Sequence, residues 1–150
     1  MSTSSPAHVD VRGPRFAAWL TTAVLAAVLV IASFSPTAAG IVLAAQTLVF
    51  AFGAVLGPRR SPYGAFFATV VAPRLTSPTE TEPAAPLRFA QAVGFVFALI
   101  GAVALLTGAV TLGLVAAGFA LFAALLNAAF GVCLGCLMYP LIVRLRPEPT

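Results

Sequence analysis

The sequence predicts an all-α membrane protein in which four transmembrane helices form two tandem two-helix hairpins, with both termini in the cytoplasm. Of the 150 residues, 61% are hydrophobic and only 8% are charged, and a soluble domain of this size cannot bury so much apolar surface. Four apolar runs are long enough to cross a bilayer. Every arginine lies outside these four runs, so the orientation can be predicted as well.

The chain is divided by composition into three parts. We expect a disordered cytoplasmic lead at 1–14, a four-helix membrane domain at 15–140 and a cytoplasmic tail at 141–150, because the two ends are rich in polar residues and proline. The spans expected within the membrane domain are 16–33, 41–56, 89–106 and 112–133. The lipid bilayer is therefore the first expected partner.

The ends of these spans follow from local signals. The first is the apolar run from Phe16, with Trp19 near its start as an interfacial anchor. The second ends at Gly57-Pro58, because this dipeptide stops a helix. The cytoplasmic loop at 57–88 follows, and apolar residues recur at helical spacing over 63–74 within it. We expect an amphipathic helix there, lying along the membrane surface.

The charges predict the orientation of the whole chain. There are eight arginines and no lysine. None lies in the short turn after the first span or in the one after the third. The positive-inside rule then places both termini and the long loop on the cytoplasmic side of the membrane. The arginines are Arg12, Arg15, Arg59, Arg60, Arg74, Arg88, Arg144 and Arg146.

The two halves of the chain resemble each other. Arg-Phe-Ala opens the first span at Arg15 and the third at Arg88, and Phe-Gly-x-x-Leu-Gly begins at Phe52 and at Phe130. These matches favour an internal duplication of a two-helix unit. Chance similarity between two alanine-rich segments is the alternative. Each motif also contains Gly-x-x-x-Gly, which predicts close packing between the second and fourth spans.

Cys133 and Cys136 are the only cysteines and the only candidate catalytic residues. On a helix their spacing puts the Cα atoms about 5 Å apart, which a disulfide tolerates. We expect the pair to close the fourth helix at the cytoplasmic boundary, where the helix dipole disfavours a thiolate. Such a pair is suited to being reduced or loaded with sulfur by a soluble partner.

Two other interpretations of the cysteines stay open. They can be small packing residues, since free cysteine is readily buried. They can also bind zinc in a homodimer that supplies four thiolates, or a cuprous ion with Met138. We predict no cofactor and no resident metal, and the sequence does not decide whether the protein is an enzyme.

Polar residues exclude several classes of function. The arginines do not interleave with aromatic residues as in a nucleic-acid-binding module. No predicted span contains a carboxylate, which argues against a proton-coupled or cation transporter. The amides of Gln46, Gln91 and Asn127 are expected to form hydrogen bonds between helices.

Several motifs together resemble a known family. They are Asp10-Val11-Arg12-Gly13-Pro14-Arg15, Gly57-Pro58-Arg59, Arg88-Phe89-Ala90-Gln91, and the run from Asn127 through Phe130-Gly131, Cys133 and Gly135-Cys136 to Met138-Tyr139. This arrangement is similar to the bacterial membrane-protein family catalogued as domain of unknown function 4395. The resemblance implies a multi-pass membrane protein associated with thioredoxin-like and sulfurtransferase proteins.

Overall fold

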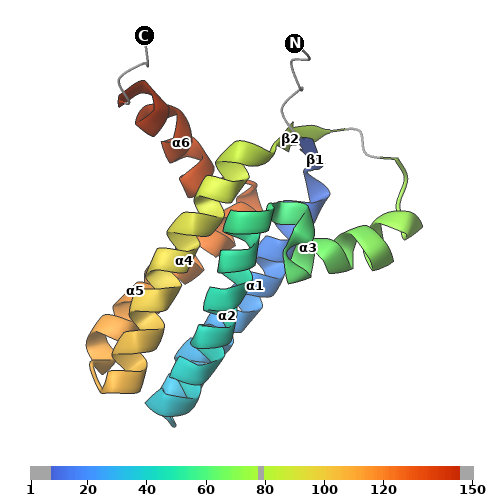
Figure 1. Ribbon diagram of the computed structural model, residues 1–150. Helices are drawn as coiled ribbons and strands as arrows, with labels where there is room; N and C mark the ends of the chain where they lie inside the picture. Colours follow the sequence, from blue (N-terminus) through green and yellow to red (C-terminus); the bar gives the residue numbers. More distant parts are fainter. Residues whose placement is uncertain (1–7, 78–79, 146–150) are drawn as a thin grey trace.

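The computed structural model describes residues 8–77 and 80–145, and four long helices dominate this part of the chain (Figure 1). Each of the four is long and apolar enough to cross a membrane. The prediction of an all-α fold with four helices able to span a membrane is therefore confirmed, apart from one pair of short strands. The long helices are α1 (Arg12–Ala32), α2 (Pro36–Leu56), α4 (Ala84–Thr107) and α5 (Val110–Phe130).

The shorter elements lie together at the end of the bundle that carries both termini (Figure 1). Two three-residue strands pair antiparallel, with His8 opposite Pro83. A helical segment covers 62–74, where we expected a helix over 63–74; its position along a membrane surface stays a prediction. The short elements are β1 (His8–Asp10), η1 (Pro58–Arg60), α3 (Pro62–Phe66), the π-helical η2 (Phe67–Val71), η3 (Ala72–Arg74), β2 (Thr81–Pro83) and α6 (Leu134–Leu145).

The beginning of the chain is more ordered than its composition suggests. Residues 8–14, expected to be disordered, form β1 and the start of α1. The Asp10 carboxylate explains this difference, because it accepts hydrogen bonds from the Arg12 backbone N–H at 3.0 Å and from the Arg12 guanidinium at 2.7 Å. The side-chain hydrogen bond from Arg12 lowers the pKa of Asp10. Residues 1–7 of the expected lead and 146–150 of the expected tail lie outside the described residues.

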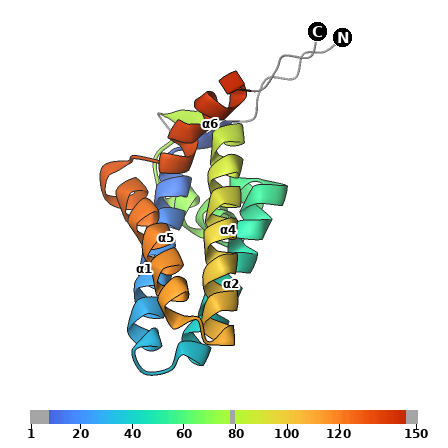
Figure 2. The ribbon, with the colours of Figure 1, turned by 90° about the vertical axis from the view of Figure 1, so that its left-hand side faces the viewer.

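The four long helices pack in a different order from the one expected. Figure 2 shows α1 beside α5 and α2 beside α4, and these pairs make extensive contacts between helices that are distant in sequence. The predicted packing of the second span on the fourth is therefore wrong. Gly53, part of the motif that suggested it, instead leaves room for Gln91 of α4. The largest side chains at the centre are Leu25, Leu43 and Leu105.

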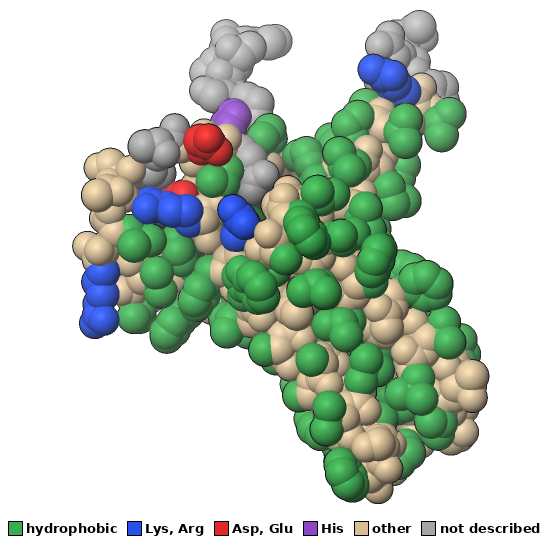
Figure 3. All heavy atoms as spheres, turned by 180° about the vertical axis from the view of Figure 1, so that it is seen from behind, with side chains coloured by type: hydrophobic (Ala, Val, Ile, Leu, Met, Phe, Trp, Pro, Cys, Tyr) green, Lys and Arg blue, Asp and Glu red, His purple; other side chains and the backbone are tan. Residues whose placement is uncertain are grey.

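The outer surface of the bundle is apolar, and its charges gather at one end. Figure 3 shows hydrophobic side chains along the long helices and arginines near the end with the termini. The turns at 33–35 and 108–109, at the opposite end, contain no charged residue. Such a surface is suited to lipid along the helices and to water at the charged end.

A buried polar network fastens the loop segment to the bundle. The amide of Gln46 in α2 is 1% exposed. Its oxygen accepts a hydrogen bond from the Tyr63 hydroxyl at 2.6 Å, and its nitrogen donates to the Thr21 hydroxyl at 3.5 Å. Burial raises the pKa of Tyr63. The expected hydrogen bond between helices is thus present for Gln46.

Candidate functional site

The fourth long helix ends before the cysteines. Gly131 adopts a φ of 70°, which favours glycine, and its N–H donates to the Asn127 carbonyl at 3.0 Å. Helix α5 therefore stops at Phe130, and α6 begins at Leu134. The expectation that one span runs over 112–133 and that the cysteines close it is wrong: the Cys-x-x-Cys motif opens the next helix.

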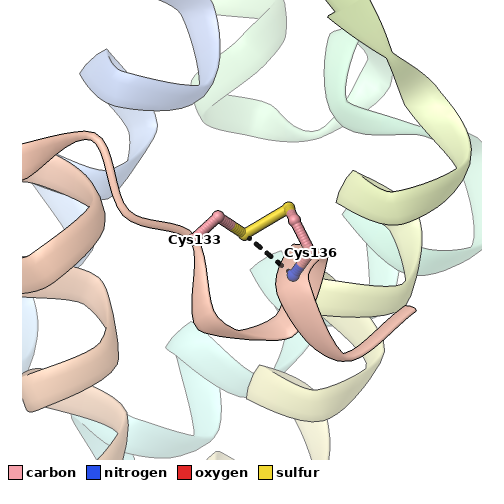
Figure 4. Close-up of a disulfide and its surroundings, with 2 residues drawn as sticks. All are labelled: Cys133 and Cys136. Carbon is pink, nitrogen blue, oxygen red and sulfur yellow. Dashed lines mark hydrogen bonds between the residues drawn. A yellow bond between two sulfur atoms is a disulfide. The ribbon is translucent and has the colours of Figure 1, made fainter. Parts of the chain in front are cut away.

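Cys133 and Cys136 form a disulfide at this helix start (Figure 4). Their Cα atoms are 5.2 Å apart, in agreement with the distance expected from the spacing. Cys133 immediately precedes α6, and its Sγ accepts a hydrogen bond from the Cys136 N–H at 3.2 Å. Its carbonyl accepts the Leu137 N–H at 3.0 Å. Cys133 thus occupies the N-cap position of α6.

The position of the pair reverses the electrostatic argument made from the sequence. A helix N-terminus carries partial positive charge and stabilises an anion, whereas a C-terminus does the opposite. In the reduced protein the Cys133 sulfur would face this N-terminus and the Cys136 N–H. The local structure therefore favours the Cys133 thiolate, the nucleophilic form of the side chain.

Helix α6 is held against α4 close to the disulfide. Gly135 lies on Ala90 of α4, and a Cβ at Gly135 would come within 2.7 Å of the Ala90 Cα. One turn further on, the rings of Phe89 and Tyr139 are 6.0 Å apart. Both cysteines are partly exposed. The pair is thus fixed in place yet open to a reagent or a partner.

A cavity of about 420 Å³ adjoins the disulfide. Cys133 contributes to its wall, and Cys136 lies outside the lining. Gln91 and Asn127 also line it. Within the described part of the chain neither amide side chain makes a hydrogen bond, so the hydrogen bonds between helices expected for these two residues are not present. The sequence identified both amides as polar residues within the spans, but it did not predict a cavity beside them.

Two arginines bind the ends of long helices near this site. Arg15 of α1 donates a hydrogen bond to the Ala128 carbonyl of α5 at 3.3 Å. Arg88 of α4 donates to the Ala54 and Val55 carbonyls of α2 at 3.1 and 2.6 Å. Each guanidinium satisfies carbonyls that a helix C-terminus leaves without a partner, and its charge suits that end of the helix.

The donor set near the cysteines is small. Among residues 8–77 and 80–145 no group of three or more His, Cys, Asp or Glu side chains is arranged to hold a metal ion. Both sulfurs are occupied by the disulfide, whereas a soft metal binds thiolates. A metal shared between two copies, or a cuprous ion with Met138, stays a prediction.

Comparison with known proteins identifies the family. No curated protein and no solved structure matches the chain. The family model described as Domain of unknown function (DUF4395) matches residues 9–144. This match extends from β1 to the last turn of α6 and includes both cysteines, and the chain therefore belongs to the DUF4395 family.

Proposed function

We propose that this protein is a multi-pass membrane component of thiol/disulfide exchange, and that its Cys133–Cys136 disulfide reacts with a thioredoxin-like or sulfurtransferase protein in the cytosol. The observation that carries this proposal is the disulfide at the start of α6, with Cys133 as the helix cap. A packing role alone would require neither a sulfur–sulfur bond nor partial exposure of both cysteines.

The geometry assigns different roles to the two sulfurs. A thiolate of the partner attacks Sγ of Cys136, the disulfide breaks, and Cys133 leaves as a thiolate. The Cys136 N–H and the α6 N-terminus stabilise this leaving group. A second thiolate of the partner then attacks the mixed disulfide and releases Cys136. The products are the dithiol of this protein and a disulfide in the partner.

A sulfurtransferase would use the same thiolate differently. The reduced Cys133 thiolate would attack the outer sulfur of the partner's persulfide, and the partner's cysteine would leave as a thiolate. Both reactions need the sulfur that the helix N-terminus favours as an anion. We therefore expect Cys133 to be the nucleophile of the reduced protein and Cys136 to be the position that a partner's thiol attacks.

The proposal includes an orientation in the bacterial plasma membrane. Both termini and the disulfide face the cytoplasm, which gives a soluble partner access. The absence of charge from the turns at 33–35 and 108–109 supports this orientation. Reporter fusions at Pro36, Ser77, Gly108 and the C-terminus test it. A cytoplasmic signal from Pro36 or Gly108 would contradict it.

We also propose that α1/α2 and α4/α5 are two copies of one hairpin. The reciprocal hydrogen bonds of Arg15 and Arg88 support this, because the first helix of each pair binds the end of the second helix of the other pair. Two of the accepting carbonyls, Ala54 and Ala128, each lie three residues before a glycine of positive φ that ends the helix. We therefore align Ala54 of the first hairpin with Ala128 of the second. The sequence motifs alone suggested a different alignment, of Phe52 with Phe130.

The exchange reaction is tested by trapping the mixed disulfide. Membranes containing the protein are incubated with a thioredoxin that lacks its resolving cysteine, and the adduct is digested and identified by mass spectrometry. We expect a link to Cys136. Differential alkylation with and without oxidant measures the dithiol and disulfide forms in parallel. Cys136→Ala is the control that should yield no adduct.

The outcomes separate the three interpretations of the cysteines. If both thiols remain equally alkylated under oxidant and no adduct forms, the cysteines only pack and the proposal fails. If a chelator is needed before the thiols react, they bind a metal. A link to Cys133 in place of Cys136 would overturn the assignment of roles and leave exchange itself intact.

A further inference from the structure

The cavity beside Cys133 has the size and lining of a small-molecule site. Its volume of about 420 Å³ falls within the usual range of ligand pockets, which are mostly apolar with a few polar groups. Helices α1, α2, α4 and α5 and the start of α6 all contribute to its wall. Phe50, Phe97 and Phe119 supply aromatic surface, and the rings of Phe97 and Phe119 are 6.1 Å apart.

The cavity extends from the disulfide into the level of the membrane spans. Asn127 and Phe119 both line it and are eight residues apart on α5, which is about 12 Å along a helix axis. Phe119 belongs to the middle of α5, and Phe97 to the middle of α4. A molecule in this cavity would therefore reach from the charged end of the bundle into the apolar layer.

Lipid is the natural source of such a molecule. Phe97, Phe119 and Phe122 line the cavity, and their exposed fractions are 37%, 60% and 58%. In a bilayer these exposed surfaces would face the acyl chains. A hydrophobic ligand dissolved in the membrane would thus reach residues of the cavity wall without crossing water.

The polar groups in the wall select a ligand that carries acceptors. The amides of Gln91 and Asn127 form no hydrogen bond with any side chain or backbone group that the structure describes. An amide in a largely apolar site gains from a partner that replaces water. Carbonyl oxygens on a flat, apolar ring would accept from these two NH₂ groups, whereas a plain acyl chain offers them nothing.

We propose that this cavity binds a membrane quinone, which reoxidises the Cys133–Cys136 dithiol. The inference rests on the proposed function, because exchange with a partner leaves the protein as a dithiol that needs a two-electron acceptor. The Cys133 thiolate and the Cys136 thiol give up two electrons and one proton as the sulfur–sulfur bond forms. The quinone takes these together with one proton from water, and its two carbonyls become the hydroxyls of a hydroquinone. Cys133, the sulfur in the cavity wall, is the thiolate that meets the ring.

The test uses the full-length protein in lipid nanodiscs. The protein is reduced, freed of reductant under anaerobic conditions and mixed with a short-chain ubiquinone. Quinone absorbance and cysteine alkylation are followed together. We expect one quinone to be reduced for each disulfide formed. Exchange with thioredoxin, measured on the same samples, reports whether each variant is folded and whether the proposed function holds.

Two phenylalanine substitutions on α5 give a matched comparison. Ala123 lines the cavity, whereas Ala129 is exposed and lies outside it. Ala123→Phe should slow quinone reduction by about tenfold or more, because the ring occupies the space of the ligand, a loss equivalent to a weakening of binding by the same factor. Ala129→Phe should keep the rate of the unmodified protein.

A second pair of variants covers the case in which Ala123→Phe does not fold. Gln91→Leu and Asn127→Leu keep the volume and remove the hydrogen-bond donors, so we expect a higher quinone concentration at half-maximal rate. Exchange with thioredoxin without any quinone reduction would overturn this inference alone, as would a tightly held phospholipid that quinone does not displace. Loss of exchange in the unmodified protein would overturn the proposed function.

Discussion

Two short helices of this protein begin with the same kind of cap. At the start of α3 the Ser61 Oγ accepts a hydrogen bond from the Gly64 N–H at 3.2 Å. At the start of α6 the Cys133 Sγ accepts one from the Cys136 N–H, also at 3.2 Å. Each helix follows a long span that ends at a glycine of positive φ. The thiol of Cys133 thus takes the place that a hydroxyl has at the other helix start.

The difference lies three residues after the cap. A Cβ at Gly64 would collide with the Pro58 carbonyl oxygen, so the start of α3 has no room for a second side chain there. The corresponding residue in α6 is Cys136, whose sulfur is bonded to the sulfur of the capping residue. The two helix starts share their capping geometry, and a disulfide at such a start requires both a cysteine as the cap and room for a second cysteine three residues later.

The largest expected effect separates capping from redox chemistry. Cys133→Ser and Cys133→Ala should both abolish exchange with thioredoxin completely, because a single sulfur cannot close the disulfide. The serine variant keeps an acceptor for the Cys136 N–H, and an N-cap of this kind contributes about 1 kcal/mol. We therefore expect the alanine variant to unfold at a lower temperature in detergent. Equal unfolding temperatures would show that the sulfur does not serve as a cap.

The second prediction concerns the space at the start of α3. Gly64→Ala should lower the free energy of unfolding by about 2 kcal/mol or more, because the new methyl group forces the backbone near Pro58 to move. Cys136→Ala is the matched change in α6 and introduces no such collision. Unfolding curves in a denaturing detergent compare the two variants after reduction of the unmodified protein. A Gly64→Ala variant as stable as Cys136→Ala would remove the proposed reason for the difference.

The sequence predicted the class of the fold well because hydropathy and length largely determine it. The four spans are each long apolar runs, and no other stretch in the described residues forms a helix of comparable length. The end of the fourth was missed because the residues after Phe130 are as apolar as those before it. A hydropathy profile contains no information on backbone conformation, so it could not predict the left-handed conformation of Gly131. Because the helix ends at this glycine, the cysteines lie at the start of α6 and not, as predicted, at the end of the fourth span.

The candidate site was predictable only in part. The spacing of Cys133 and Cys136 was sufficient to predict a bridge, since three residues in a helical turn give the required separation. The cavity was not, because its wall comes from all four long helices and from α3 and α6, and the small-residue motifs predicted the packing order of the long helices wrongly. The amides illustrate the same limit: Gln46 accepts a hydrogen bond from Tyr63 of the loop segment, whereas Gln91 lies against Gly53 and lines the cavity.

The third prediction tests whether the two long-helix ends are equivalent. Gly57 and Gly131 have φ values of 98° and 70°, and a Cβ at either would meet nothing within 4 Å. Gly131 has a ψ of 16° and is left-handed, so alanine there should cost about 1 kcal/mol. Gly57 has a ψ of 162°, a conformation that essentially only glycine adopts, so alanine should cost more there. Gly131→Ala should also slow exchange with thioredoxin, because this residue sets the direction of the chain into Cys133. Gly57→Ala serves as the control for exchange, and an equal slowing by both variants would contradict this account.

The smallest effects are expected from the two arginines that bind helix ends. Arg88 donates to two carbonyls of α2, at 3.1 and 2.6 Å, whereas Arg15 donates to one carbonyl of α5, at 3.3 Å. Both side chains lie at an exposed end of the bundle, where a hydrogen bond contributes about 1 kcal/mol or less. Arg88→Ala should therefore destabilise the protein more than Arg15→Ala, as measured by unfolding curves in a denaturing detergent. Because each arginine joins one pair of helices to the other, we expect their contacts to support each other, so that the double variant costs less than the sum of the two single variants. A cost equal to the sum would show that the two ends act independently.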